Sequence, residues 1–179
     1  TFCFPQGQAS PTACPPGSYC TSTQTAPTPC PLGSYNGASQ ATNASACAPC
    51  PLGTFCFPHG QSSPTACTAG CYCPSSGLSF PVQCPPGSYC PSSGMIAPTP
   101  CSPGNFCPHS SMTTMTTCTA GGYYCPSSGM LTPLTCPPGS YCPFSGMTAA
   151  TPCPAGSYSP FNSAISINTC QACLAGAYC

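Results

Sequence analysis

The sequence contains no Lys, Arg, Asp or Glu among its 179 residues. General acid–base catalysis draws on carboxylates, Lys, His, Tyr or free Cys, and nucleic-acid binding draws on Lys and Arg. Calcium sites and two-metal sites draw on carboxylates. We therefore expect that the chain is not an enzyme, binds no nucleic acid, and holds no metal or other cofactor besides covalent glycans.

Zero charge also affects solubility, because chains with little net charge tend to associate. We expect either that this chain assembles with copies of itself or that sugars attached to its hydroxyl groups hydrate the surface. Long hydrophobic runs are absent too, and none approaches the roughly 20 residues of a membrane span. The sequence shows no signal peptide and no initiating Met, so we expect a piece of a longer, processed chain.

Cysteine is abundant, with 22 residues, and so are Pro (28) and Gly (18). This much Cys indicates a disulfide scaffold, which persists in an oxidising compartment. The abundant Pro and Gly oppose long helices and central strands. An extracellular location, secreted or at the cell surface, follows as the prediction.

A short motif, Cys-x-x-Gly-x-aromatic, recurs ten times at steps of 16 to 20 residues, most often 17. The copies begin at Cys14, Cys30, Cys50, Cys67, Cys84, Cys101, Cys118, Cys136, Cys153 and Cys173. The glycine, read as Gly121 in the copy at Cys118, predicts a tight turn with positive φ. The aromatic, read there as Tyr123, is expected to stack on its neighbours and on a disulfide in a thin spine.

The repeat predicts a fold class of small disulfide-rich tandem repeats. We expect an elongated, solenoid-like array of about ten modules with short β-hairpins and turns and little or no helix. The array should be continuous over residues 1–179 without a domain boundary. Segment 1–20 matches 54–73, and segment 30–56 matches 153–179, so Cys3 and Cys179 both correspond to Cys56.

Most copies have a second Cys directly after the aromatic, but two have Asn36 or Ser159 there and gain Cys47 or Cys170 instead. One pairing scheme follows from this exchange and leaves Cys3 and Cys71 unpaired or intermolecular. Its pairs are Cys14–Cys20, Cys30–Cys47, Cys50–Cys56, Cys67–Cys73, Cys84–Cys90, Cys101–Cys107, Cys118–Cys125, Cys136–Cys142, Cys153–Cys170 and Cys173–Cys179. A rival scheme bridges the connecting loops, as in Cys3–Cys14 and Cys90–Cys101, and sequence alone leaves both open.

The linkers between motifs share a Ser-Gly turn followed by an apolar residue. These residues, expected to be small apolar plugs, are Leu78, Met95, Met130 and Met147.

Sugar attachment is predicted at two kinds of position. Asn43-Ala44-Ser45 is an N-glycosylation sequon in a polar, loop-like stretch. Clustered or Pro-flanked threonines suit O-glycosylation: Thr21, Thr23, Thr25, Thr28, Thr99, Thr113, Thr114, Thr116 and Thr117. The alternative is a plain hydroxylated surface.

Other candidate sites have simpler interpretations. His59 and His109 lack an acidic partner and are expected to be exposed loop residues. Cys71 could be a nucleophile only as a free thiol with a nearby His, and an intermolecular bridge or a buried thiol is favoured. Cys47/Cys50 and Cys170/Cys173 have the spacing of zinc ligands, but the Pro-Gly turns between cysteines favour disulfides. Ice binding by threonine rows is disfavoured because the spacing does not follow the repeat.

The motif with its Cys-x-x-Cys junctions resembles the ephrin-receptor-like cysteine-rich repeat. The clearest stretches run from Cys30 through Phe55 and from Cys153 to Tyr178, whereas other copies differ by the Cys after the aromatic. The resemblance implies extracellular arrays, as in receptor ectodomains and in large secreted or surface proteins of protists and algae, including flagellar hairs (mastigonemes). We therefore predict a structural subunit of an extracellular fibre or coat that associates head to tail. The alternative is a rigid stalk or ligand-binding ectodomain of a receptor or adhesin.

Overall fold

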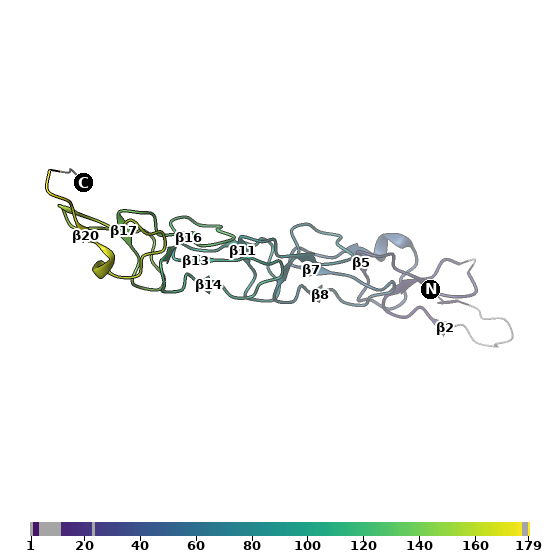
Figure 1. Ribbon diagram of the computed structural model, residues 1–179. Helices are drawn as coiled ribbons and strands as arrows, with labels where there is room; N and C mark the ends of the chain where they lie inside the picture. The colour runs from purple at the N-terminus through teal and green to yellow at the C-terminus, as the bar shows by residue number, and fades with distance from the viewer. Residues whose placement is uncertain (1, 4–11, 23, 177–178) are drawn as a thin grey trace. The chain divides into compact units, whose positions relative to one another are not determined.

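The chain divides into two compact units, each built from five antiparallel hairpins. The computed structural model describes residues 2–3, 12–22, 24–176 and 179, and only the backbone of 2, 3 and 12. The first unit comprises Thr1–Gln83 with Ser92–Pro98, and the second comprises Cys84–Pro91 with Thr99–Cys179. Within each unit the hairpins follow one another in chain order (Figure 1).

Every hairpin consists of two strands of two residues each. Those of the first unit are β1–β2 (Phe2–Cys3, Thr12–Ala13), β3–β4 (Ser18–Tyr19, Thr28–Pro29), β5–β6 (Ser34–Tyr35, Ala48–Pro49), β7–β8 (Thr54–Phe55, Thr65–Ala66) and β9–β10 (Cys71–Tyr72, Val82–Gln83). Those of the second are β11–β12 (Ser88–Tyr89, Thr99–Pro100), β13–β14 (Asn105–Phe106, Thr116–Thr117), β15–β16 (Tyr123–Tyr124, Leu134–Thr135), β17–β18 (Ser140–Tyr141, Thr151–Pro152) and β19–β20 (Ser157–Tyr158, Gln171–Ala172). The described residues contain two short 3-10 helices, η1 (Ala44–Ala46) and η2 (Ile167–Thr169), and no α-helix. The predicted class, small disulfide-rich repeats with almost no helix, is confirmed.

A hydrogen-bonded β-turn precedes eight of the hairpins in the described chain, as the segment from Pro137 to Ser140 illustrates. The Ser140 amide donates to the Pro137 carbonyl at 3.2 Å, and Gly139 has φ 80°. A positive φ at the third turn position is the type II geometry that glycine accepts without steric cost. The turn leads into β17, which pairs with β18 so that Tyr141 lies opposite Thr151.

In the copy of the motif that begins at Cys118, the structure shifts the glycine and aromatic positions by one residue from those predicted. The second cysteine of this copy comes seven positions later instead of six. The structure places Gly122, not Gly121, at the conserved turn position and Tyr124, not Tyr123, at the aromatic position opposite Leu134. The register is set by the distance to the second cysteine, and the extra residue is absorbed in the turn, where Gly121 has φ 120°.

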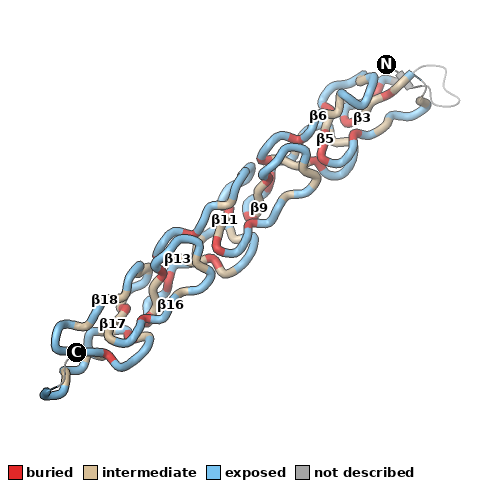
Figure 2. Tube along the Cα trace, turned by 90° about the horizontal axis from the view of Figure 1, so that it is seen from above, coloured by how far each residue is buried: buried red, intermediate tan, exposed pale blue. Residues whose placement is uncertain are grey.

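Cystines form the core of both units. Fifteen cysteines have 0% exposure, and the only other buried residue of the hydrophobic class among the described residues is Ala164 at 4%. Figure 2 shows these buried positions as short stretches inside the hairpins, with the loops exposed. Sulfur therefore occupies the volume that aliphatic side chains fill in ordinary domains.

The predicted aromatic spine is wrong. The motif aromatics that the structure describes are half-buried, or exposed in the case of Tyr158 at 39%, and Tyr178 lies outside the described residues. Among the described residues, the one close ring pair is Phe57 with Phe80, at 4.7 Å between centroids, and neither belongs to the motif. Successive side chains of a strand point to opposite faces. The side chain of the cysteine after the aromatic points into the core, so the aromatic side chain points to the other face.

Candidate functional site

Ten disulfides lie in the described chain, and they join the pairs of the first scheme. Eight link the two cysteines of one motif across six or seven residues, whereas Cys30–Cys47 and Cys153–Cys170 span 17 residues. Both members of seven of the eight short bridges have 0% exposure; Cys173–Cys179 is the exception, with Cys173 half-buried and Cys179 exposed. Cys71 is free, and the side chain of Cys3 lies outside the described residues.

Within each unit, backbone hydrogen bonds join successive modules, a module being the segment from one first cysteine to the next. At the boundary between the modules of Cys101 and Cys118, the Cys118 amide donates to the Gly104 carbonyl at 2.9 Å, and the Gly104 amide donates to the Cys125 carbonyl at 2.8 Å. The loop of the later module returns two further bonds. The Gly129 amide donates to the Cys101 carbonyl, and the Met130 carbonyl accepts from the Cys107 amide, both at 2.8 Å.

The same four hydrogen bonds recur at seven module boundaries, three in the first unit and four in the second. They form at the boundaries that begin with Cys30, Cys50, Cys67, Cys101, Cys118, Cys136 and Cys153. Because only main-chain groups take part, the interface does not depend on which polar side chain a module carries. Each module therefore presents one set of groups to its predecessor and the complementary set to its successor.

The turn glycines also permit a contact two modules along. A Cβ built on Gly104 would lie 2.6 Å from the Gly146 carbonyl oxygen, and one on Gly33 would lie 2.1 Å from that of Gly77. Six turn glycines have a loop carbonyl this close: Gly17, Gly33, Gly53, Gly87, Gly104 and Gly122. Glycine is thus required at this position for two reasons: it adopts a positive φ without strain, and it leaves the space that a side chain would occupy.

The loop that supplies these contacts contains a residue in the left-handed conformation, followed by the apolar residue predicted as a plug. The predicted plugs are half-buried, and their carbonyls accept the hydrogen bond from the preceding module. The sequence analysis missed Met112, which does the same after Ser111, with φ 58°. Gln40 and Ser163 likewise replace the loop glycine with φ 63° and 58°. The Ser-Gly signal failed to identify these loops because a non-glycine residue holds the left-handed position.

The two modules that lack the second cysteine fill its position differently. Asn36 is 4% exposed; its Nδ2 donates to the Ser18 carbonyl at 3.0 Å, and its Oδ1 accepts from the Ala38 amide at 3.0 Å. Ser159 is 0% exposed, and its Oγ has no hydrogen-bond partner in the part of the chain that the structure describes. At this core position the Asn36 amide group forms its hydrogen bonds, whereas the shorter Ser159 hydroxyl reaches no partner among the described residues.

Exchanging these two residues should change stability in opposite directions. We expect Ser159→Asn to raise the free energy of unfolding by about 1 kcal/mol, because the amide can reach the Ser140 carbonyl as Asn36 reaches Ser18. The reciprocal control Asn36→Ser should lower it by about 1–2 kcal/mol, since it removes both side-chain bonds. Denaturant unfolding of each variant checks the pair, and a loss of stability in Ser159→Asn would contradict the assignment.

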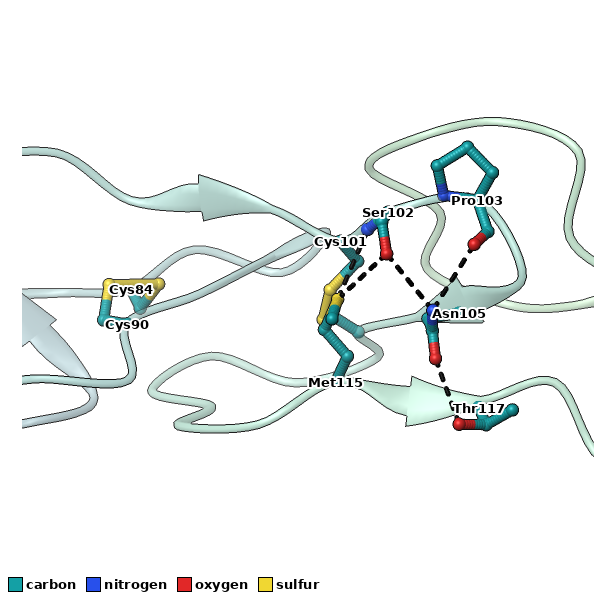
Figure 3. Close-up of a disulfide and its surroundings, with 9 residues drawn as sticks. Cys84, Cys90, Cys101, Ser102, Pro103, Asn105, Met115 and Thr117 are labelled. Atoms are coloured by element: carbon teal, nitrogen blue, oxygen red, sulfur yellow. Dashed lines mark hydrogen bonds between the residues drawn. A yellow bond between two sulfur atoms is a disulfide. The ribbon is translucent and has the colours of Figure 1, made fainter. Parts of the chain in front are cut away.

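Polar side chains support one module of the second unit further (Figure 3). Ser102 donates from its amide and its hydroxyl to the Met115 sulfur at 3.3 and 3.5 Å. Asn105 Nδ2 donates to the Ser102 hydroxyl at 3.2 Å, and Asn105 Oδ1 accepts from the Thr117 hydroxyl at 3.0 Å. These contacts join the turn and β13 to β14 beside the Cys101–Cys107 bridge.

Cys71 is half-buried at a position that Ser occupies in five modules. The equivalent Ser34 donates from its amide and its hydroxyl to the Pro31 carbonyl at 3.1 and 2.7 Å, and the Cys71 amide donates to the Thr68 carbonyl at 3.1 Å. The thiol therefore takes the place of a turn hydroxyl. Exposed His59 and His109 lie in different units.

We expect Cys71→Ser to change the free energy of unfolding by no more than about 0.5 kcal/mol, because the hydroxyl can form the same turn contact. Titration with a chromogenic disulfide reagent should show one thiol fewer per chain. A loss of more than about 2 kcal/mol would show that this sulfur takes part in a bond that stabilises the fold.

The candidate sugar sites are accessible where the structure describes them. Asn43 is exposed and caps η1; its Oδ1 accepts from the Ser45 amide at 3.0 Å and from the Ser45 hydroxyl. Six of the nine threonines are exposed, namely Thr25, Thr99, Thr113, Thr114, Thr116 and Thr117. Thr21 and Thr28 are half-buried, and Thr23 lies outside the described residues.

The Cys-x-x-Cys junctions are not metal sites in this structure. Cys47 bonds to Cys30, Cys50 bonds to Cys56, and the second junction is bridged in the same way. In the part of the chain that the structure describes, no three His or Cys side chains gather in a manner that could hold a metal ion.

No family model matches the chain, and no curated protein is significantly similar to it. No helix formed by the described residues is long and apolar enough to cross a membrane. Ten disulfides in a tandem array of small hairpins nevertheless fit a structural or surface protein of an oxidising compartment.

Proposed function

We propose that the chain is a structural subunit of an extracellular fibre or surface coat in which copies associate head to tail. The observation that supports this most is the repeated module boundary, where the same four main-chain hydrogen bonds recur seven times. The two sides of a module differ and complement each other, so the contact is heterologous. Heterologous contacts that do not close into a ring produce filaments.

Composition supports the same proposal. A chain without Lys, Arg, Asp or Glu has no charge repulsion to keep copies apart. Main-chain hydrogen bonds and buried cystines hold the modules, so assembly requires neither salt bridges nor a large apolar interface. Disulfides would maintain the subunit outside the cell, where chaperones and reductants are scarce.

A second candidate function is a rigid stalk or ligand-binding ectodomain of a cell-surface receptor or adhesin. The partly exposed aromatics of the described modules favour this candidate, because aromatic side chains at a surface are common in binding sites. In this case the chain would remain monomeric and present its surface to a ligand.

Electron microscopy and light scattering of the purified, oxidised chain distinguish these functions. Regular filaments that lengthen with protein concentration are expected for the fibre subunit, whereas monomeric particles at all concentrations would contradict it. The variant Cys71→Ser serves as a control. Filaments that persist in this variant show that stacking drives association, and filaments that disappear show that an intermolecular disulfide does.

Glycosylation belongs to the same proposal and has its own test. We expect the chain from its natural source to exceed 17.8 kDa and to approach that mass after removal of N- and O-linked glycans. Asn43→Gln should eliminate the enzyme-sensitive N-linked mass. An intact mass equal to that of the bare chain would contradict the sugar coat.

A further inference from the structure

We propose that the outward faces of the hairpins bind an uncharged polysaccharide through cross-strand pairs of an aromatic residue and a threonine. Five hairpins bring such a pair together by strand register: Tyr19 with Thr28, Phe55 with Thr65, Tyr89 with Thr99, Phe106 with Thr116 and Tyr141 with Thr151. Residues directly opposite each other in an antiparallel pair have Cβ atoms roughly 5 Å apart. The two side chains therefore form one small surface.

Strand alternation directs this surface away from the core. In the hairpin of β11 and β12, Cys90 is 0% exposed, so the preceding residue, Tyr89, points to the other face. Tyr89 is half-exposed and Thr99 is exposed. Neither hydroxyl has a hydrogen-bond partner among the described residues. The pair thus offers a ring face and two free hydroxyls.

This combination matches the chemistry of a neutral pyranose polymer. The C–H faces of a flat sugar ring are apolar and stack on an aromatic ring, while the sugar hydroxyls hydrogen-bond to side-chain hydroxyls. The absence of Lys, Arg, Asp and Glu removes ion pairing as a means of recognition. A polyanion or a polycation would gain nothing from this surface that a neutral polymer does not.

Repetition provides the affinity that a single pair lacks. The same four boundary bonds recur within each unit, so successive hairpins there are related by similar steps. Two hairpins of the first unit and three of the second carry a pair, so each unit offers more than one contact. When several weak contacts engage one polymer, the later contacts form intramolecularly and the overall affinity rises steeply. A polysaccharide, itself a regular repeat, can use such a series.

The test is depletion of the oxidised chain from solution by microcrystalline cellulose and by chitin beads, after enzymatic removal of its glycans. Deglycosylation matters because sugar on Thr28, Thr99 or Thr116 would occupy the proposed surface. We expect depletion by at least one of these polymers, and no depletion by insoluble calcium alginate beads, a polyanion. Pelleting without polymer corrects for self-association, so the fibre proposal can fail while this one holds.

Matched variants assign the binding to the ring. The double variant Tyr89→Ala with Tyr141→Ala should weaken binding about tenfold, whereas Tyr89→Phe with Tyr141→Phe, which keeps both rings, should bind within about twofold of the unmodified chain. Thermal unfolding checks that both variants remain folded. Absence of binding to both polymers, or equal binding by the Ala variant and the unmodified chain, would overturn the proposal.

Discussion

Replacing Gly104 by alanine should lower the free energy of unfolding of the second unit by about 4 kcal/mol. Gly104 has φ 81°, and a Cβ there would lie 2.6 Å from the Gly146 carbonyl oxygen, in a loop two modules along. The left-handed conformation alone costs a non-glycine residue roughly 1–2 kcal/mol. The remainder comes from displacing the loop, because an added methyl group and that oxygen cannot occupy the same space.

Gly139→Ala is the matched control for this prediction. Gly139 has nearly the same φ, 80°, and the same turn position, but nothing lies within 4 Å of its built Cβ. This variant should therefore lower the free energy of unfolding only by the cost of the left-handed conformation, about 1–2 kcal/mol. Denaturant unfolding of the two variants measures the difference. Equal losses would show that the contact two modules along contributes nothing to stability.

Removing a buried cystine should produce the other large effect. We expect Cys101→Ala with Cys107→Ala to lower the free energy of unfolding by about 4 kcal/mol. Loop closure over six residues accounts for about 2 kcal/mol of this in the chain-entropy description. The rest arises because both sulfurs are fully buried, so alanine leaves a cavity in a core that has almost no other apolar residue.

The control for this prediction is Cys173→Ala with Cys179→Ala. That bridge also spans six residues, but Cys173 is half-buried and Cys179 is exposed. It should cost about 2 kcal/mol, the loop-closure contribution alone. Denaturant unfolding of each double-alanine variant, with its other disulfides intact, gives the comparison. If the two variants lose the same stability, burial of sulfur is not what stabilises the modules.

Turn chemistry was predictable from the sequence, whereas the cysteine spacing left two pairing schemes open, of which the structure has the first. The spacing of Cys14 and Cys20 and its repeats predicted small hairpins with little helix, and the exchange of a cysteine at Asn36 for Cys47 indicated a longer bridge in that module. The glycine of the motif predicted a turn with positive φ, as found at Gly139. These features are local, so short-range rules of turn and disulfide geometry suffice for them.

Features that depend on packing between modules were not predictable in the same way. The sequence analysis placed the aromatics in the core, because large apolar residues are usually buried. A module of about 17 residues has no second layer to cover a tyrosine, so the cystine takes the interior and Tyr89 remains half-exposed. Contacts between Gly104 and the loop at Gly146 leave no sequence signal beyond the glycine itself.

The predicted glycine and aromatic positions in the copy at Cys118 were wrong for a different reason. Two consecutive glycines, Gly121 and Gly122, are each followed two residues later by a tyrosine, and counting from the first cysteine selected the wrong one. Counting back from Cys125 would have selected Gly122, since the hydrogen bonds of the hairpin fix that distance. The loops with Gln40, Ser111 and Ser163 show a related limit, because a left-handed residue that is not glycine carries no reliable signal.

The most direct test of the account is thermal unfolding followed by circular dichroism, with and without a strong phosphine reductant that is small enough to reach buried disulfides. The oxidised chain should stay folded to high temperature. The fully reduced chain should be unfolded at room temperature, because no apolar core or ion pair remains to hold ten small hairpins together. A reduced chain that keeps the oxidised spectrum and a cooperative transition would contradict the claim that buried cystines stabilise this fold.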